Sequence, residues 1–156
     1  MQALNLPETE LKVTTKDGKQ HVFDILRRKY VALTPEEWVR QQFVHYLISH
    51  KGYPAECIGN EISLTLGGTK KRCDSVVYGQ GAQPVMIVEY KSPQVEITQQ
   101  VFEQISRYNI KLRVKWLVVS NGLHHYCCQI DYESGTYRFV EDIPPYGNIC
   151  FTNENI

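Results

Sequence analysis

Two carboxylates and a lysine occupy neighbouring strand candidates near the middle of the chain. Asp74 lies on the first candidate, and Glu89 and Lys91 lie at the polar end of the next. If these strands pair as a regular antiparallel hairpin centred between Gly81 and Ala82, Asp74 faces Glu89 with the two Cβ atoms about 4.5–5.5 Å apart. Because side chains alternate along a strand, Lys91 then shares the face of Glu89. The spacing therefore predicts two carboxylates and an ammonium group on one face of a sheet.

Two opposed carboxylates repel one another unless a positive charge compensates them. Their oxygens suit Mg²⁺ or Mn²⁺, so we expect Asp74 and Glu89 to bind a divalent ion. The ion would neutralise phosphate charge and acidify water, while Lys91 would orient or deprotonate the nucleophile or stabilise the transition state. This chemistry is metal-assisted hydrolysis of a phosphodiester. The competing interpretation is a metal-free ladder of ion pairs at an exposed edge, because the pattern Glu-x-Lys is common by chance.

Basic side chains near these residues could contact the phosphate backbone of DNA without reading its sequence. The formal net charge of the chain is zero. That balance excludes coating of nucleic acid by bulk electrostatics but not a local basic site. No zinc-finger, helix-turn-helix or RNA-recognition signature suggests base specificity, and an ordinary solvated surface is the alternative. The candidate DNA-binding residues are Lys70, Lys71, Arg72 and Arg107.

The elements that position these residues predict one α/β domain spanning residues 1–156. An Asp-Gly turn between β-prone runs predicts a hairpin over residues 11–25. Thr34-Pro35-Glu36-Glu37 matches a capping box and begins a helix that ends near Gly52. A second helix over residues 99–110 and the surrounding strands complete a mixed β-sheet with helices on both faces. The expected strands are residues 61–66, 72–78 and 85–90, the segment KWLVVSNG, and a closing hairpin of HHYCCQID and TYRFVED.

Asp74, followed by Glu89-x-Lys91 on the next strand, resembles the signature of the PD-(D/E)xK nuclease superfamily. On the second helix, Gln104 and Tyr108 resemble the Q-xxx-Y motif of several of its branches. The wider pattern is similar to the family called type I restriction enzyme R protein N-terminal domain, over about residues 30–145. The segments that carry this similarity are TPEEWVRQQFVHYLI, KKRCDSVVYG, PVMIVEYKSP, FEQISRYN and WLVVSNG.

The resemblance implies a restriction-endonuclease-like fold and a Mg²⁺-dependent or Mn²⁺-dependent DNA endonuclease. It implies that Asp74 and Glu89 are metal ligands and that Lys91 is the catalytic lysine. Cys73 stands where the superfamily name has proline, at a position without a chemical role. The alternative on the same fold is a non-catalytic module for nucleic-acid binding or assembly.

The resemblance also implies roles for residues on the two helices. Gln104 and Tyr108 lie one turn apart on one helix face and would contact the nucleic-acid backbone or the water at the metal. Their ordinary interpretation is a solvated Gln104 and a core Tyr108, which the helical pattern turns inward. Glu37 would add a further acidic group to the site, although the capping box also explains it. Glu61 is another acidic candidate, for which a position at the rim of the site is favoured.

Cysteine usage and length set the expected surroundings. Five cysteines without C-x-x-C spacing indicate reduced thiols in a cytoplasmic protein. No apolar stretch approaches the ~18 residues that a membrane span needs. Nothing in the chain resembles the helicase motor of type I restriction subunits. We therefore expect DNA as a partner, and either a stand-alone nuclease-like protein or a domain whose motor or specificity subunit is encoded elsewhere. A homo-oligomer remains an open alternative.

Overall fold

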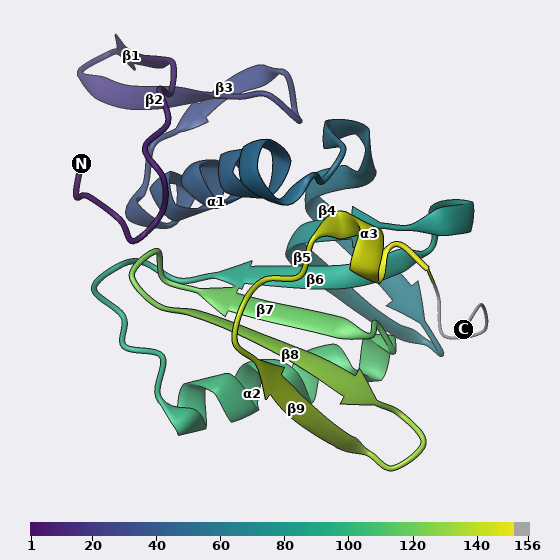
Figure 1. Cartoon of the computed structure of the whole chain (residues 1–156). Helices are drawn as coiled ribbons and strands as arrows, with labels where there is room; N and C mark the ends of the chain where they lie inside the picture. Colours follow the sequence, from purple (N-terminus) through teal and green to yellow (C-terminus); the bar gives the residue numbers. More distant parts are fainter. Residues whose placement is uncertain (152–156) are drawn as a thin grey trace.

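A computed structural model describes residues 1–151 of the chain. Within these residues a six-stranded mixed sheet has the order β4-β5-β6-β7-β8-β9 (Figure 1). Strands β6 and β7 run parallel, and the other neighbouring pairs are antiparallel. The α/β architecture expected from the sequence is confirmed. The strands are β4 (Ile58–Leu66), β5 (Thr69–Tyr78), β6 (Pro84–Tyr90), β7 (Trp116–Ser120), β8 (His125–Asp131) and β9 (Thr136–Val140).

One helix covers each face of this sheet, α1 (Pro35–Lys51) on one side and α2 (Gln99–Asn109) on the other (Figure 1). Phe43 of α1 packs into the same buried cluster as Val88 of β6. Phe102 of α2 belongs to a second cluster with Ile87, the preceding residue of that strand. The continuous apolar run of β6 is therefore buried on both faces, as a central strand requires.

The helix termini follow from local hydrogen-bonding chemistry. The Thr34 hydroxyl accepts from the Glu37 amide at 3.1 Å, and the Thr98 hydroxyl accepts from the Val101 amide at 3.2 Å. These bonds satisfy amides that lack a partner inside the helix. Gly52 ends α1 in the left-handed conformation, with φ of 74°, which glycine adopts without steric cost.

A separate three-stranded antiparallel sheet precedes α1 and lies on the side of that helix away from the main sheet (Figure 1). The expected hairpin is confirmed, and a third strand that the sequence analysis did not predict extends it. Val22 is fully buried beneath this sheet. The strands are β1 (Val13–Lys16), β2 (Lys19–Asp24) and β3 (Lys29–Ala32).

Short helical turns join the remaining elements.

No helix within residues 1–151 is long and apolar enough to cross a membrane. Cys127 and Cys128 enter opposite core clusters, as alternation along β8 predicts, and all five thiols are free. The short elements are the 3₁₀ turns Ala55–Cys57, Gln80–Ala82 and Ile110–Leu112, and α3 (Tyr146–Ile149).

Candidate active site

The pairing of β5 with β6 sets the two carboxylates side by side. Ser75 pairs with Val88, so one further step along the same register brings Asp74 to Glu89, the juxtaposition that the sequence predicted. The hairpin is not regular near its turn, because a bulge after Val77 shifts the register there. The irregularity is confined to the residues between this bulge and the loop. The pairing of β5 with β6 stays regular from Val77 back towards Asp74.

The regular alternation of side chains along β5 is interrupted at Asp74, so that the residues before and after it point to opposite sides of the main sheet. Cys73 belongs to the core cluster beneath α2. The Ser75 hydroxyl instead bonds to Asn60 at 2.7 Å and accepts from the Tyr90 hydroxyl at 2.9 Å, on the α1 side. Between them, Asp74 Oδ2 accepts the backbone N–H of Tyr90 at 2.9 Å. This hydrogen bond holds the Asp74 carboxylate against β6. The Asp74 side chain remains half-exposed, at the point where the pairing of β5 with β6 ends.

The surroundings of the Glu89 carboxyl group disfavour its negatively charged form. Its side chain is 13% exposed. Burial, together with the nearby charge of Asp74, raises the pKa of Glu89 to about 7. The Lys71 ammonium, whose Nζ lies 2.6 Å from Glu89 Oε1, lowers the pKa and so partly offsets this rise. The pair therefore takes up a proton near neutral pH unless additional positive charge is supplied.

Lys91 follows Glu89 by two residues, just past the end of β6. Its amide donates to the Ser120 carbonyl at 2.8 Å, which continues the pairing with β7. If the alternation of β6 continues through this residue, the Lys91 side chain lies on the side of Glu89, as the sequence predicts. The side chain is half-buried and forms no ion pair with any group of residues 1–151. Its ammonium is thus uncommitted, unlike that of Lys71.

Glu37 is buried in α1 and surrounded by donors. Arg27 and Arg40 each donate at 2.9 Å and Gln41 donates at 3.0 Å to its carboxylate. Burial alone would raise the pKa of Glu37, but these hydrogen bonds and the charge of Arg40 hold it below its ordinary value. The carboxylate half of the expected capping box is absent within the described chain, because Glu37 engages these side chains and the Thr34 amide donates to the Ala32 carbonyl.

Arg40 connects Glu37 to the candidate site. Its Nη1 donates to the Asp74 carbonyl at 2.8 Å and pairs with Glu61 at 2.7 Å. Glu61 also pairs with Arg72 at 2.6 Å and has a φ of 56°. Glu37 thus reaches the backbone of Asp74 through Arg40, and Glu61 lies in β4 on the far side of β5 from Glu89. A direct acidic role for either residue stays a prediction.

Gln104 and Tyr108 are both exposed on the outer side of α2. The expectation that Tyr108 faces inward is wrong, because its side chain is 58% exposed and the next residue, Asn109, is buried instead. Gln104 and Tyr108 line a hollow of about 390 Å³ with Arg107 and Lys111. Within residues 1–151 no hydrogen bond or ion pair joins this hollow to Asp74 or Glu89.

The predicted DNA contacts divide into two groups. Lys70 and Arg107 are exposed and unpaired within the described chain. Lys71 and Arg72 are paired with Glu89 and Glu61, although the Arg72 side chain remains 69% exposed. The Lys71–Glu89 contact was missed from the sequence. Regular alternation along β5 could not predict it, because the strand changes face at Asp74.

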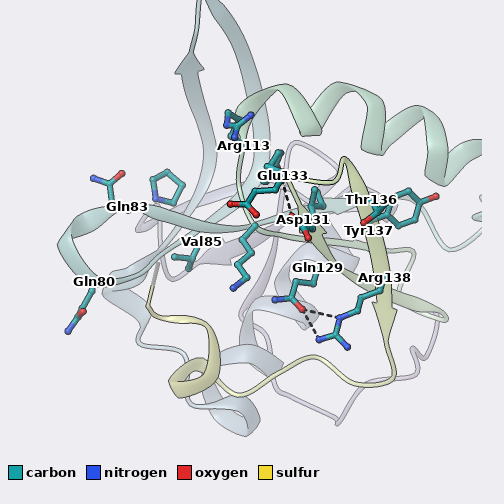
Figure 2. A pocket seen from close by; sticks show the side chains of 14 residues that line it. Gln80, Gln83, Val85, Arg113, Gln129, Asp131, Glu133, Thr136, Tyr137 and Arg138 are labelled. Atoms are coloured by element: carbon teal, nitrogen blue, oxygen red, sulfur yellow. Dashed lines mark hydrogen bonds between the residues drawn. The ribbon is translucent and has the colours of Figure 1, made fainter. Parts of the chain in front are cut away.

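A hollow of about 1080 Å³ lies at the end of the main sheet away from Asp74 and Glu89 (Figure 2). The start of β6, the end of β8 and the β8–β9 turn form its walls. Arg113, Lys115 and Arg138 share this space with Asp131 and Glu133. None of the predicted catalytic residues lines it, so hollow size does not identify the site.

The donor set at Asp74 and Glu89 fits a divalent cation of the magnesium type. No cluster of three or more His, Cys, Asp or Glu side chains suited to a metal occurs in residues 1–151. Mg²⁺ commonly uses one or two carboxylates and takes its other ligands from water and substrate phosphates. Burial first, and then the charge of Asp74, raise the pKa of Glu89, and a bound divalent ion would favour its charged form.

Comparisons with known proteins agree with the sequence resemblance. The sequence model of the family described as type I restriction enzyme R protein N terminus matches residues 35–144. Among solved structures, one fragment described as an HsdR subunit of a type I restriction enzyme from Vibrio vulnificus YJ016 superposes with a TM-score of 0.54 at 21% identity. The match covers 75% of this chain and 24% of that one, so the chain spans about a quarter of the fragment's length. No curated protein sequence matches the chain.

Proposed function

Because the chain belongs to the family of type I restriction enzyme R protein N-termini, we propose that it is a metal-dependent endonuclease domain of the PD-(D/E)xK superfamily that hydrolyses DNA phosphodiesters. The observation that carries the proposal is the half-buried pair of Asp74 and Glu89, with Lys91 two residues after Glu89 and unpaired within residues 1–151. Carboxylates held together at this cost in charge repulsion are what a divalent cation compensates.

Asp74 and Glu89 would hold Mg²⁺ or Mn²⁺. When bound, the ion supplies neutralisation of phosphate charge and a lower pKa for a nearby water. The Tyr90 amide holds the Asp74 carboxylate in place, and Arg40 holds the backbone on its other side. Lys91 orients the attacking water or takes its proton, and its positive charge stabilises the additional negative charge of the transition state.

Residues away from the carboxylates would hold the DNA. Lys70 and Arg107 supply unpaired positive charge for phosphates, and Gln104 and Tyr108 supply hydrogen bonds from the exposed side of α2. Arg72 keeps Glu61 neutralised and has an exposed side chain for a further phosphate. Glu37 contributes through Arg40, by fixing the strand that carries Asp74.

A second candidate function is a non-catalytic module for DNA binding or assembly. The contact between Lys71 and Glu89 favours it, because a lysine at 2.6 Å already supplies part of the charge that a metal ion would bring. In this second function Lys71 takes the place of the metal ion beside Glu89. The domain then binds DNA or another subunit through its surface and catalyses no reaction.

The proposed setting is a larger assembly in the cytoplasm, the reducing compartment that five cysteines without a regular pairing pattern favour. The Vibrio vulnificus fragment is about four times as long as the part that this chain matches. We therefore propose that a motor or specificity subunit works with this domain on DNA.

Cleavage of supercoiled plasmid, linear duplex and single-stranded DNA separates the two candidates. We expect the chain to nick or cut DNA in Mg²⁺ or Mn²⁺ and not in EDTA. Asp74→Asn and Lys91→Met should each lower the rate by about 100-fold or more, whereas Lys51→Met, a matched lysine change on α1, should leave it unchanged. Binding without cleavage in either metal would favour the non-catalytic module. Equal cleavage by the wild type and Asp74→Asn would refute the assignment.

A further inference from the structure

The sheet of β1, β2 and β3 lies outside the part of the chain that matches the family, which begins at residue 35. It projects from α1 on the side away from the main sheet (Figure 1). One of its faces packs onto the domain through Val22 and Asp24, both fully buried. The side chains of the opposite face are exposed or half-buried, so their chemistry indicates what kind of partner this face could bind.

Alternation and register give the composition of that outward face. His21 and Phe23 alternate with the buried residues of β2 and therefore point outward. Phe23 pairs with Tyr30 of β3, and Lys19 pairs with Lys16 of β1. The Phe23 and Tyr30 rings pack edge to face, with centroids 5.3 Å apart. The two packed aromatic rings lie on the same face of the sheet as the lysines.

The outward face and its rim are strongly basic. Between residues 12 and 32 the carboxylates are Asp24, which is buried, and Asp17, which lies in the β1–β2 turn. No basic side chain of the face or rim forms an ion pair within residues 1–151. These side chains are Lys12, Lys16 and Lys19 on the face and Arg28 in the turn before β3.

Two details show that this charge lacks compensation. Lys16 and Lys19 are direct cross-strand partners, an arrangement that destabilises a hairpin through repulsion of like charges. The Lys12 ammonium lies 5.7 Å from the centroid of the Phe23 ring, which holds it on the same face. A polyanion laid across the sheet would relieve the repulsion and meet all three ammonium groups.

We propose that the outward face of the β1–β3 sheet binds the phosphate backbone of DNA, with Lys12, Lys16 and Lys19 as its principal contacts. The choice of DNA as the polyanion rests on the proposed function. The charge itself is independent of catalysis, so binding can be measured where cleavage cannot occur. The sheet would hold the duplex beside the domain without reading its sequence, as contacts to phosphates do.

Fluorescence anisotropy of a labelled DNA duplex, measured in EDTA over a range of salt concentrations, tests the proposal. A variant with Lys12→Gln, Lys16→Gln and Lys19→Gln should bind about 10- to 100-fold more weakly, and its salt slope should fall by about 2 to 3. The matched control is Arg113→Gln, Lys115→Gln and Arg138→Gln in the hollow of Figure 2, which removes the same charge from the other end of the molecule. It should bind like the wild type. Urea unfolding of both variants shows whether each remains folded.

Equal loss of binding in the two triple variants, or loss in the control alone, overturns the proposal. So does a wild-type chain that fails to bind the duplex, or that binds only vesicles of anionic phospholipid included as a second ligand. Binding that depends on the three lysines while Mg²⁺ and Mn²⁺ produce no cleavage upholds this surface and refutes the nuclease. Cleavage together with unchanged binding by the lysine variant upholds the nuclease and refutes this surface.

Discussion

At the scale of single residues, the chemistry of the candidate site depends on how Glu89 is charged. Its carboxyl is nearly enclosed and lies beside Asp74, so its pKa is raised to about 7 despite the ammonium of Lys71. Asp74 instead stays half-exposed and accepts a backbone amide. The two carboxyl groups therefore differ in how strongly their surroundings disfavour a negative charge.

The free energy of unfolding should report this titration in metal-free buffer. A carboxyl with a pKa near 7 in the folded chain and 4.5 in the unfolded chain binds its proton more tightly when folded. Its contribution to stability is therefore present at low pH and is lost as the pH rises through about 7. Between about pH 5 and pH 8 the wild type should lose about 1–3 kcal/mol relative to Glu89→Gln.

Urea unfolding in EDTA at a series of pH values measures that difference. Glu8→Gln, an exposed change of the same chemistry, should follow the wild type at every pH. Parallel curves for the wild type and Glu89→Gln would show that Glu89 has an ordinary pKa, and would remove the charge argument for a cation.

At the scale of elements, α1 is joined to the candidate site by charge as well as by apolar packing. Arg40 bridges Glu37, Glu61 and the backbone of Asp74, and so ties the helix to β4 and β5. Arg27 extends the same network to the N-terminal sheet, through Glu37 and Asp24. The position of Asp74 thus depends on Arg40, a helical residue 34 positions earlier in the chain.

Loss of the Arg40 guanidinium should strongly destabilise the fold. Arg40→Met leaves the buried Glu37 and the half-buried Glu61 each short of a partner, which costs about 3–5 kcal/mol in such networks. Lys51→Met on the same helix changes a half-buried cation that forms no ion pair within residues 1–151 and should cost less than about 1 kcal/mol. Urea unfolding of the two variants makes the comparison. Similar stabilities would mean that the network contributes little.

The elements were largely predictable because their signals are local. Thr34 and Gly52 mark the ends of α1, and the apolar run before Glu89 marks a central strand. The third N-terminal strand was not predictable, because its residues are mostly exposed and carry no periodic apolar signal. The inward orientation of Tyr108 failed because helical periodicity alone did not place the boundary of the buried stripe.

The candidate site was predictable in part. The register of β5 on β6 follows from a hairpin count that the bulge near the turn did not disturb at Asp74. The contacts of Lys71 and Arg40 required the change of face in β5 and the packing of α1, neither of which leaves a local pattern in sequence.

At the scale of the whole molecule, the zero net charge is an average over unlike parts. Residues 131–156 contain five acidic and one basic side chain, whereas residues 1–130 contain 16 basic and 12 acidic ones. Much of the unpaired positive charge is on the N-terminal sheet, and part of the negative charge is buried at the site and in the network of Arg40. A chain of neutral composition can thus present a basic surface to DNA.

Reactivity of the five thiols tests the packing of the molecule as a whole. Cys57 and Cys150 are half-buried, whereas Cys73, Cys127 and Cys128 are buried on the two sides of the main sheet. Burial also raises the pKa of Cys73 to about 11, which suppresses the reactive thiolate. A thiol reagent should therefore modify two cysteines in the native chain and all five in urea. Rapid native reaction of all five would contradict this packing.

The central claim is that Asp74 and Glu89 together form a centre for a divalent cation. Its most direct test is a Mn²⁺ titration followed by the electron paramagnetic resonance signal of the free ion, at a pH above the pKa of Glu89. We predict saturable binding by the wild-type chain, weakened at least about 10-fold in Asp74→Asn and in Glu89→Gln and unchanged in Glu8→Gln. Equal Mn²⁺ binding by the wild type and the two site variants would contradict the claim.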